Sequence, residues 1–378
     1  MADNLCMAKP VRRIGILTGG GDCPGLNAVI RAVTMGALAC ELEVLGIEDG
    51  FFGLVENRVR PLGIPEVGGI LNVGGTILGS NNKFNPKSAV IGRDEQGKPI
   101  KRDMTELCVN TLRVHGIDAM VVIGGDGTLT IANDFAQAGI PCIGVPKTID
   151  NDLVGTDITF GFATAVATAT DAIDKVRTTA ASHHRAMVVE VMGRNAGWIA
   201  LHAGVAGAAH AILIPEIPFS LDALTGFLQS RVSKGRRHSI ICVAEGAKPM
   251  GGSQIVSRVD DTSPDPIRLG GVGKYVADEI EKRTGIESRS VILGHVQRGG
   301  TPVPADRVLS TQFGHHAMQL LLEGKWNRMV AMQHGKLTDI DIAEPAGKQR
   351  LVRRDDPLIR AARGVGTGFG DQVGEQCA

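Results

Sequence analysis

The chain repeats one order of features: an apolar run, a glycine-rich turn and a helix-forming stretch. Residues 119–123 (AMVVI) contain no polar side chain, which is typical of a strand buried on both faces of a sheet. A glycine turn at 124–128 follows this run. We then predict a helix that reaches Ala138, because Gly139 is a residue type that commonly ends helices.

A second series with the same order occupies the later half of the chain. The other predicted strands are residues 11–18, 140–145, 186–192, 211–214, 239–244 and 291–293, and further helices are predicted to begin at Pro24 and at Trp198. Alternating strands and helices favour parallel sheets with helices on both faces. We therefore predict an α/β protein with two doubly wound, Rossmann-like lobes, mostly parallel sheets and an active-site cleft between them.

The predicted lobes are each built from two parts of the chain. The first combines residues 1–160 with about 297–340, and the second combines 161–296 with about 341–378. Residues 246–273 are rich in Gly, Pro, Ser and Asp, a composition that predicts a long loop. The tail beyond Gly335 has mixed charge and gives little information about fold or function.

Composition narrows the classes of function. Of 378 residues, 43% are hydrophobic and 21% charged, a balance typical of a folded protein of two medium domains. Lys and Arg together number 40, as do Asp and Glu, so no overall field draws the chain to nucleic acid or to a membrane surface. No apolar run reaches the ~18–20 residues that span a bilayer. We therefore expect neither nucleic acid nor a membrane as partner.

The start of the chain and its cysteines predict a cytoplasmic protein. Residues 1–13 have neither the apolar segment nor the small-residue cleavage site of a signal peptide. The seven cysteines are scattered, odd in number and contain no C-x-x-C pair. That usage suits reduced thiols better than disulfides or a zinc site.

Two glycine loops are candidates for binding phosphate. The loops at 19–22 (GGGD) and 124–128 (GGDGT) follow predicted strands and lead into predicted helices. Backbone N–H groups and the helix dipole attract anions at such places, although a tight structural turn is the alternative interpretation. Asp126 would repel a phosphate unless a cation lay between them, and Mg²⁺ suits that role. A helix N-cap is the competing interpretation of Asp126.

An acidic pair follows the strand that ends at Val145. The segment 147–152 (KTIDND) carries Asp150 and Asp152, whose side chains would point the same way if the backbone were extended. A hydroxyl that attacks phosphorus needs a base to take its proton, and an aspartate can supply it. An Asx-rich turn without function is the alternative.

Four arginines lie near the ends of predicted strands or in loops. They are Arg185, Arg194, Arg289 and Arg298. Guanidinium groups bind two phosphate oxygens at once, but a single arginine is more often a solvated surface residue. The block at 293–300 (LGHVQRGG) is more specific, because an apolar strand leads directly into polar donors and two glycines.

The chain resembles the phosphofructokinases from about Arg13 to about Gly335. The matching blocks, in the order found in that family, are residues 18–25 (TGGGDCPG), 124–128 (GGDGT), 147–152 (KTIDND), 189–194 (VEVMGR) and 294–300 (GHVQRGG). The GGDGT block also looks like a motif of NAD kinases and diacylglycerol kinases, but those kinases leave the other four blocks unexplained. The chain is most similar to the longer branch of the family, whose members use ATP or pyrophosphate.

The resemblance implies a role for each matching residue. Asp150 would be the base, assisted by Thr148, Asp152 and Arg194, and Asp126 would hold Mg²⁺. The implied donor-binding residues are Gly21, Lys83, Gly125, Asp126, Gly127, Thr128 and Lys147, most of them in the first lobe's loops. The implied substrate-binding residues are Thr148, Ile149, Asp150, Arg185, Met192, Gly193, Arg194, Glu245, Arg289, His295, Val296, Gln297 and Arg298. Arg185 and Arg289 resemble a pair that reaches the sugar phosphate of a neighbouring subunit, which implies a homo-oligomer, either a dimer or a tetramer.

The resemblance implies transfer of the ATP γ-phosphoryl group to the 1-hydroxyl of fructose 6-phosphate, a step of glycolysis. Members that use pyrophosphate typically carry Asp where this chain has Gly127, and Lys where it has Lys147. Glycine leaves room for a nucleotide, whereas aspartate would occupy that space, so we favour ATP. A pyrophosphate-dependent phosphotransferase is the main alternative. A non-catalytic sugar-phosphate sensor is the next, although Asp126, Asp150 and Arg194 are all present.

Overall fold

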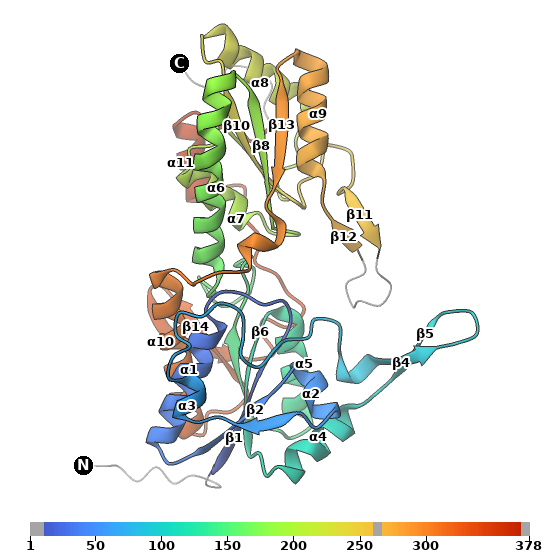
Figure 1. Cartoon of the computed structure of the whole chain (residues 1–378), viewed down its shortest axis with the longest axis vertical. Coiled ribbons are helices and arrows are strands. Elements are labelled where there is room, and N and C mark those ends of the chain that lie inside the picture. The colour runs from blue at the N-terminus through green and yellow to red at the C-terminus, as the bar shows by residue number, and fades with distance from the viewer. Residues whose placement is uncertain (1–10, 260–266, 372–378) are drawn as a thin grey trace.

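Two sheets, each flanked by helices, lie one above the other along the longest axis of the molecule (Figure 1). The structure is a computed structural model that describes residues 11–259 and 267–371. Both sheets are mostly parallel. The predicted fold class, α/β with two doubly wound lobes, is confirmed.

The first lobe contains a seven-stranded sheet. Its strands, in spatial order, are β15 (Lys336–Asp341), β14 (Arg328–Gln333), β7 (Cys142–Pro146), β6 (Ala119–Gly124), β1 (Arg13–Thr18), β2 (Glu43–Ile47) and β3 (Val59–Pro61). The edge strands β15 and β3 pair antiparallel with their neighbours, and the other pairs are parallel. The central strand β6 is buried at every position, as its apolar run predicts.

Helices cover both faces of this sheet. One face packs against α1 (Leu26–Ala39) and α10 (Pro304–Leu322), and the other against α2 (Phe51–Val55), α4 (Thr105–Val114) and α5 (Asp126–Gln137). The short helix α3 (Ile64–Val67) and the turn η1 (Pro86–Ser88) complete this lobe. The carboxyl ends of β1, β6 and β7 meet at the edge of the sheet that faces the second lobe (Figure 1).

The second lobe contains a four-stranded, wholly parallel sheet. Its order is β13 (Ser288–Ile292), β8 (Ala186–Val191), β10 (Ser239–Ala244) and β9 (Ala211–Leu213). Its helices are α6 (Phe162–His183), α7 (Trp198–Ala206), α8 (Leu221–Ser233), α9 (Val272–Thr284) and α11 (Pro357–Gly364), and the turn η2 (Gly294–Gln297) leads back toward the first lobe.

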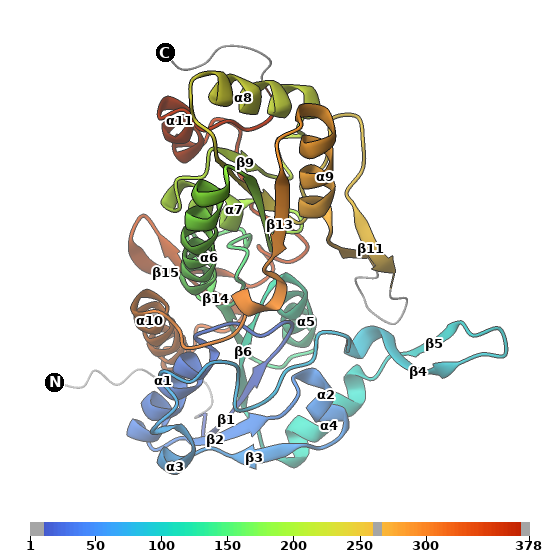
Figure 2. The same cartoon turned by 45° about the horizontal axis from the view of Figure 1, so that its top comes forward.

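One hydrophobic core runs through both lobes. It joins Ile16 and Val121 of the first sheet to Val189 of the second, with Phe162 and Ile173 of α6 between them. The long helix α6 lies beside the second sheet in the two views, and one of its ends points toward the first lobe (Figures 1 and 2). None of the described helices is both long enough and apolar enough to cross a membrane.

Two segments differ from their predictions. Residues 246–273 are not one long loop, because β11 (Val256–Val259) and β12 (Ile267–Leu269) form an antiparallel hairpin and α9 already begins at Val272. A second hairpin, β4 (Ala89–Arg93) with β5 (Pro99–Arg102), projects from the first lobe (Figure 2). The strands of both hairpins are only three to five residues long and mix polar with apolar residues, so they lack the apolar runs that marked the core strands.

Candidate active site

The first glycine loop follows β1 and lines an open pocket of about 390 Å³. Gly19 donates its backbone N–H to Ile123, and Gly20 donates to Asn81 with a positive φ of 78° that favours glycine. The pocket is lined by Gly20, Gly21, Asp22, Gly75, Thr76, Ser80 and Asn82. The lining is mostly backbone amides and small polar side chains, which suits an anionic ligand.

The second glycine loop joins β6 to α5. Gly125 is the N-cap and Asp126 is the first residue of the helix, so the N-cap interpretation of Asp126 is wrong. Thr128 packs so closely that a Cβ at Gly124 would lie 2.3 Å from the Thr128 Cβ. A Cβ at Gly127 would meet nothing within 4 Å, so this position faces open space. The loop therefore presents the Asp126 carboxylate at a helix N-terminus, where the dipole attracts anions, and leaves space beside Gly127 for a ligand to approach.

Lys147 lies between the two glycine loops. Its backbone N–H donates to Gly124 (2.9 Å), and its ammonium group donates to the carbonyl of Gly21. The side chain is only 4% exposed, and burial lowers the pKa of Lys147 below its usual value. The structure therefore brings a buried cation to the place where the two predicted phosphate loops meet.

The acidic segment after β7 is a turn, the alternative interpretation of its sequence, and not an extended segment. Thr148 Oγ1 accepts from the backbone N–H of Asp150 (3.1 Å) and donates to Asp152 Oδ1 (3.2 Å), and Asn151 has a positive φ of 52°. The Asx-rich turn and the paired carboxylates therefore coexist. Ile149 is fully buried in the core, which leaves only its backbone available to a substrate.

The two carboxylates influence each other. Burial, followed by the charge of Asp152, raises the pKa of Asp150 to about 7. Burial also raises the pKa of Asp152, and the charge of Asp126 adds to that shift. Asp150 Oδ1 is buried and has no hydrogen-bond partner among the described residues. A carboxyl group with a pKa near neutrality and an unsatisfied oxygen is a candidate general base.

Loops of the second sheet approach the same turn from the other side. Both Arg298 and Glu245 lie near enough to change the pKa of Asp150, which the charge of Arg298 lowers and the charge of Glu245 raises. Arg298 Nη1 donates to the carbonyl of Asp22 (3.2 Å), so residues 276 positions apart meet. Gln297 is fully buried, and its Oε1 accepts from the backbone N–H of Met192 (3.3 Å). The block after β13 is thus joined both to the first glycine loop and to the loop after β8.

The loop after β8 has a tightly constrained backbone. Gly193 has a φ of 138°, and a Cβ there would lie 2.8 Å from the carbonyl oxygen of Ala196. Burial raises the pKa of Glu245, while a backbone hydrogen bond from Gly193 and the charge of Arg194 oppose this shift. Arg194 therefore lies close enough to influence a group that in turn acts on Asp150.

Three predicted residues are exposed. Val296 is 62% exposed, and His295 lies beside it in η2, where its carbonyl accepts from the N–H of Arg298 (3.0 Å). Lys83 lies in an exposed turn, and its backbone N–H donates to Asn81 Oδ1 (2.9 Å).

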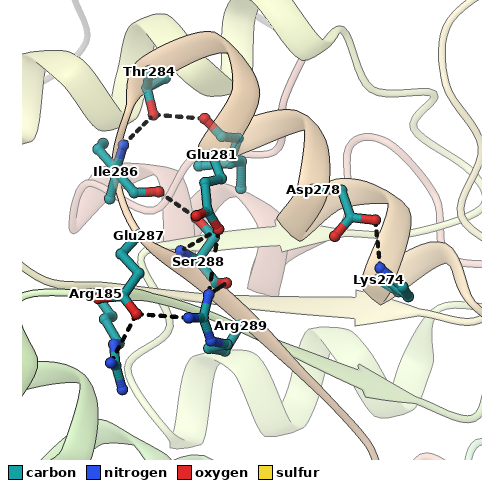
Figure 3. A network of polar contacts seen from close by, with 10 residues as sticks. Arg185, Lys274, Asp278, Glu281, Thr284, Ile286, Glu287, Ser288 and Arg289 are labelled. Carbon is teal, nitrogen blue, oxygen red and sulfur yellow. Dashed lines mark hydrogen bonds and ion pairs between the residues drawn. The ribbon is translucent and has the colours of Figure 1, made fainter.

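Arg185 and Arg289 are not part of this cluster in their own chain. Arg185 precedes β8 and Arg289 lies near the start of β13, so both are at the amino ends of strands whose carboxyl ends carry the site. Five or six residues of strand separate these ends by about 15–20 Å. Both guanidinium groups contact Glu287, Arg185 at 2.8 Å and Arg289 at 2.7 Å (Figure 3). The two arginines converge on one carboxylate, an arrangement that also fits a phosphate.

The C-terminal segment contributes contacts to the site that no sequence pattern predicted. Gly347 donates its backbone N–H to Asp126 Oδ1 (2.7 Å), and Gln349 Nε2 donates to Asp152 Oδ2 (3.1 Å). The tail has no apolar strand or glycine block near Gln349 that could have marked it. Thr76 and Ser80 of the pocket were also missed, because they lie in an irregular segment after α3.

The carboxylates fit a magnesium ion. No group of three or more His, Cys, Asp or Glu residues that could hold a metal occurs in the described part of the chain. Mg²⁺ needs only one or two protein carboxylates and takes its other ligands from phosphate and water. Burial raises the pKa of Asp150 and of Asp152, and a like charge adds to each shift, that of Asp152 for Asp150 and that of Asp126 for Asp152. Among the described residues, Asp150 Oδ1 has no hydrogen-bond partner. A divalent cation would relieve this repulsion.

Comparison with known proteins places the chain among established relatives. A protein-family model described as phosphofructokinase matches residues 13–321. The chain is 48% identical over 367 residues to a Clostridium perfringens protein named ATP-dependent 6-phosphofructokinase 2, covering 97% of this chain and all of the relative. It is also 49% identical over 341 residues to an Amycolatopsis methanolica protein named pyrophosphate–fructose 6-phosphate 1-phosphotransferase, covering 90% of this chain and 96% of that relative.

Solved structures agree with these relatives. The crystal structure of Pichia pastoris phosphofructokinase in the T-state matches with a TM-score of 0.75 and 32% identity, covering 89% of this chain and 35% of that longer chain. The Marinobacter aquaeolei pyrophosphate-dependent phosphofructokinase shares the fold, with a TM-score of 0.78 at 20% identity, covering 95% of this chain and 88% of that one. From the family model and the near-complete overlap with relatives 48–49% identical, the chain belongs to the phosphofructokinase family.

Proposed function

We propose that this protein is an ATP-dependent 6-phosphofructokinase, a phosphotransferase that converts fructose 6-phosphate to fructose 1,6-bisphosphate. The observation that carries the proposal is the environment of Asp150. Its pKa is raised to about 7, its Oδ1 has no hydrogen-bond partner in the described part of the chain, and Arg298 and Lys147 lie near enough for their charges to act on it. A base near neutrality beside cations is what phosphoryl transfer to a hydroxyl requires.

The two lobes have different tasks in this proposal. Residues 1–160 with about 297–340 bind the donor phosphates through Gly21, Gly125, Gly127, Thr128 and Lys147, with Lys83 at the rim. Residues 161–296 with about 341–378 bind the sugar phosphate through Met192, Gly193 and Glu245. The block from His295 to Arg298 binds on the same side. The hydrogen bond from the backbone N–H of Met192 to Gln297 Oε1, which crosses the boundary at residue 297, supports a site shared between the lobes.

The catalytic groups act on the acceptor hydroxyl and on the charge that develops during transfer. Asp150 takes the proton of the 1-hydroxyl, and Thr148 and Asp152 hold the turn that presents it. Arg194 stabilises negative charge on the transferring group. Mg²⁺, held by Asp126, supplies charge neutralisation to the donor phosphates when bound.

The donor is assigned from Gly127. The open space at this position leaves room for a nucleotide beyond its terminal phosphates. Pyrophosphate is the second candidate, because the buried cation Lys147 lies where either donor's phosphates would bind and because the 49% identical relative is named as pyrophosphate-dependent.

Arg185 and Arg289 act, in this proposal, in the site of a second subunit. They lie a full strand length from Asp150 in their own chain, yet they converge on one carboxylate as they would on a phosphate (Figure 3). A homo-oligomer, dimer or tetramer, would place this pair at a neighbour's sugar-phosphate site.

A coupled assay tests the proposal. Purified protein with fructose 6-phosphate and Mg²⁺ is offered ATP, ADP or pyrophosphate in separate reactions, and formation of fructose 1,6-bisphosphate is measured. We expect the highest kcat/KM with ATP. Turnover with pyrophosphate alone would support the second candidate. Binding of fructose 6-phosphate without turnover on any donor would refute the enzyme assignment in favour of a sensor.

A further inference from the structure

The segment from Gly347 to Val352 connects the two lobes at the site. Gly347 donates to Asp126 Oδ1, and the backbone N–H of Arg350 donates to the carbonyl of Asp152 (2.7 Å). Gln349 pairs with Leu153 as an antiparallel bridge. Val352 donates to Glu216 Oε1 (2.9 Å), which also accepts from Gly197 (3.0 Å). The segment thus contacts the acidic turn of one lobe and the loop after β8 of the other.

Arg350 fixes this segment in place. Its guanidinium lies over the ring of Trp198, 4.5 Å from the ring centroid, and the indole N–H donates to the Arg350 carbonyl (2.8 Å). Its Nη2 also donates to the carbonyls of Asn151 and Asp157, both at 2.9 Å. A cation that stacks on tryptophan and donates from Nη2 to two carbonyls is anchored at several points, although its buried Nε has no hydrogen-bond partner among the described residues. The neighbouring Gln349 is therefore held at a defined position.

The side chain of Gln349 joins two functional loops. Its Nε2 donates to Asp152 Oδ2 (3.1 Å), and its Oε1 accepts from Asn195 Nδ2 (2.9 Å). An ionised carboxylate can only accept, so the amide nitrogen must face Asp152 and the oxygen must face Asn195. Asn195 follows Arg194 directly. One amide therefore connects the acidic turn after β7 to the arginine loop after β8.

We infer that Gln349 is a positioning residue that holds the Asp152 carboxylate and the Arg194 loop at a fixed separation. The two loops belong to different sheets, and their relative placement otherwise depends on how the lobes pack. Phosphoryl transfer depends on placing base and stabilising cation within fractions of an ångström, so a small misplacement costs turnover rather than binding. This effect on turnover rests on the proposed function, whereas the connection between the loops does not.

The kinetic test uses Gln349→Met, which keeps the length of the side chain and removes both hydrogen bonds. We expect kcat to fall about 10-fold, with the KM for each substrate within about threefold of the wild type. Gln349→Glu keeps the acceptor for Asn195 but places a second carboxylate against Asp152, so its kcat should be at least as low. The matched control is Gln333→Met, which removes one hydrogen bond to the Gly155 carbonyl (2.8 Å) and should leave kcat within about twofold.

A double-mutant cycle and hydrogen exchange separate positioning from general destabilisation. The double variant Asn195→Ala/Gln349→Met should lose less kcat than the product of the two single-variant losses predicts, because both substitutions break the same connection. Amide exchange on the whole protein should rise at 148–153 and 193–197 in Gln349→Met but not in Gln333→Met. An unchanged kcat, an equal loss in Gln333→Met, or unchanged exchange at these loops would overturn the inference. Exchange is measured without substrate, so an inactive wild type would refute the proposed function alone.

Discussion

Lys147 donates its ammonium group to the carbonyl oxygen of Gly21, although 126 positions separate the two residues. The contact joins the end of β7 to the glycine loop after β1. Because the ammonium is buried, its positive charge is poorly screened and acts strongly on any anion that enters the loop. The same burial lowers the pKa of Lys147, because the charged form loses its hydration.

Substitution of Lys147 should therefore weaken donor binding. We expect Lys147→Met to raise the KM for the phosphoryl donor at least about 10-fold, because a cation close to phosphate oxygens is lost. The KM for fructose 6-phosphate should change far less. Steady-state kinetics with each substrate varied in turn would measure both. Lys87→Met is the control: Lys87 pairs with Asp134 at the surface, and its loss should leave both KM values within about twofold. Equal changes in the two KM values would contradict a donor-specific role.

Asp150 should control both turnover and its dependence on pH. We expect Asp150→Ser to lower kcat at least about 10²-fold, the lower range of general-base effects, with a smaller change in KM. In the wild type, kcat/KM should fall as pH drops below about 7, because the base becomes protonated there. Asp152→Asn should move that fall to lower pH, since removal of the neighbouring charge lowers the pKa of Asp150. A pH profile that Asp152→Asn does not shift would contradict the coupling.

The same carboxylate should make the free protein less stable at neutral and alkaline pH. The folded-state pKa of Asp150 lies above its unfolded value, so the folded state binds the proton more tightly than the unfolded state does. The contribution of Asp150 to the free energy of unfolding therefore falls as pH rises from the unfolded pKa toward about 7. Without metal or substrate, Asp150→Asn should raise the urea midpoint at pH 8, and the gain should shrink as pH falls toward 4. Asp171→Asn, in an exposed pair with Lys175, should show no such trend. A gain that is independent of pH would refute the electrostatic cause.

The fold was predictable where burial imposes a continuous apolar run. The run at 119–123 became β6, and residues 239–244 became β10 with the expected bounds. The strand expected at 291–293 begins earlier, at Ser288. It lies at the edge of its sheet, and it begins with three consecutive polar residues, Ser288, Arg289 and Ser290, which hide it in the sequence. Edge strands and hairpins carry a weaker pattern, because one side of them meets water.

The site was predictable where chemistry is concentrated in one stretch after a strand. Asp126 and Asp150 each lie in such a stretch, and the structure places both close to Asp152. The charge of Asp126 raises the pKa of Asp152, and the charge of Asp152 raises the pKa of Asp150. Gln349 could not be found in that way. Its role depends on backbone contacts that bring the tail to Leu153, and a lone glutamine carries no local signal of a partner 154 positions away.

Gly127→Asp should change the donor. The position faces open space, so the substitution should fold normally. The new carboxylate would fill the room beyond the terminal phosphates and repel the nucleotide, so we expect ATP-dependent kcat/KM to fall at least about 100-fold, because like charges in close contact repel strongly. Pyrophosphate-dependent activity should appear or increase. Gly226→Asp offers a control, because a Cβ there also meets nothing within 4 Å. Retained ATP activity without pyrophosphate activity would refute the assignment of the donor from Gly127.

Arg289 should act on the sugar phosphate bound to another subunit. Alone, Arg289→Ala should raise the KM for fructose 6-phosphate at least about 10-fold, since a charge-assisted contact to phosphate is lost. If Arg289 completes the site of a neighbouring subunit, each active site combines Asp150 of one chain with Arg289 of the other. An oligomer that pairs one Arg289→Ala chain with one Asp150→Ser chain then contains one site with both native residues. Unfolding an equal mixture together and refolding it should then recover about a quarter of the wild-type sites, as random pairing across a twofold interface predicts. The same variants refolded separately and then mixed serve as the control. If Arg289 acted within its own chain, every site of the mixed oligomer would lack one residue, and joint refolding would recover nothing.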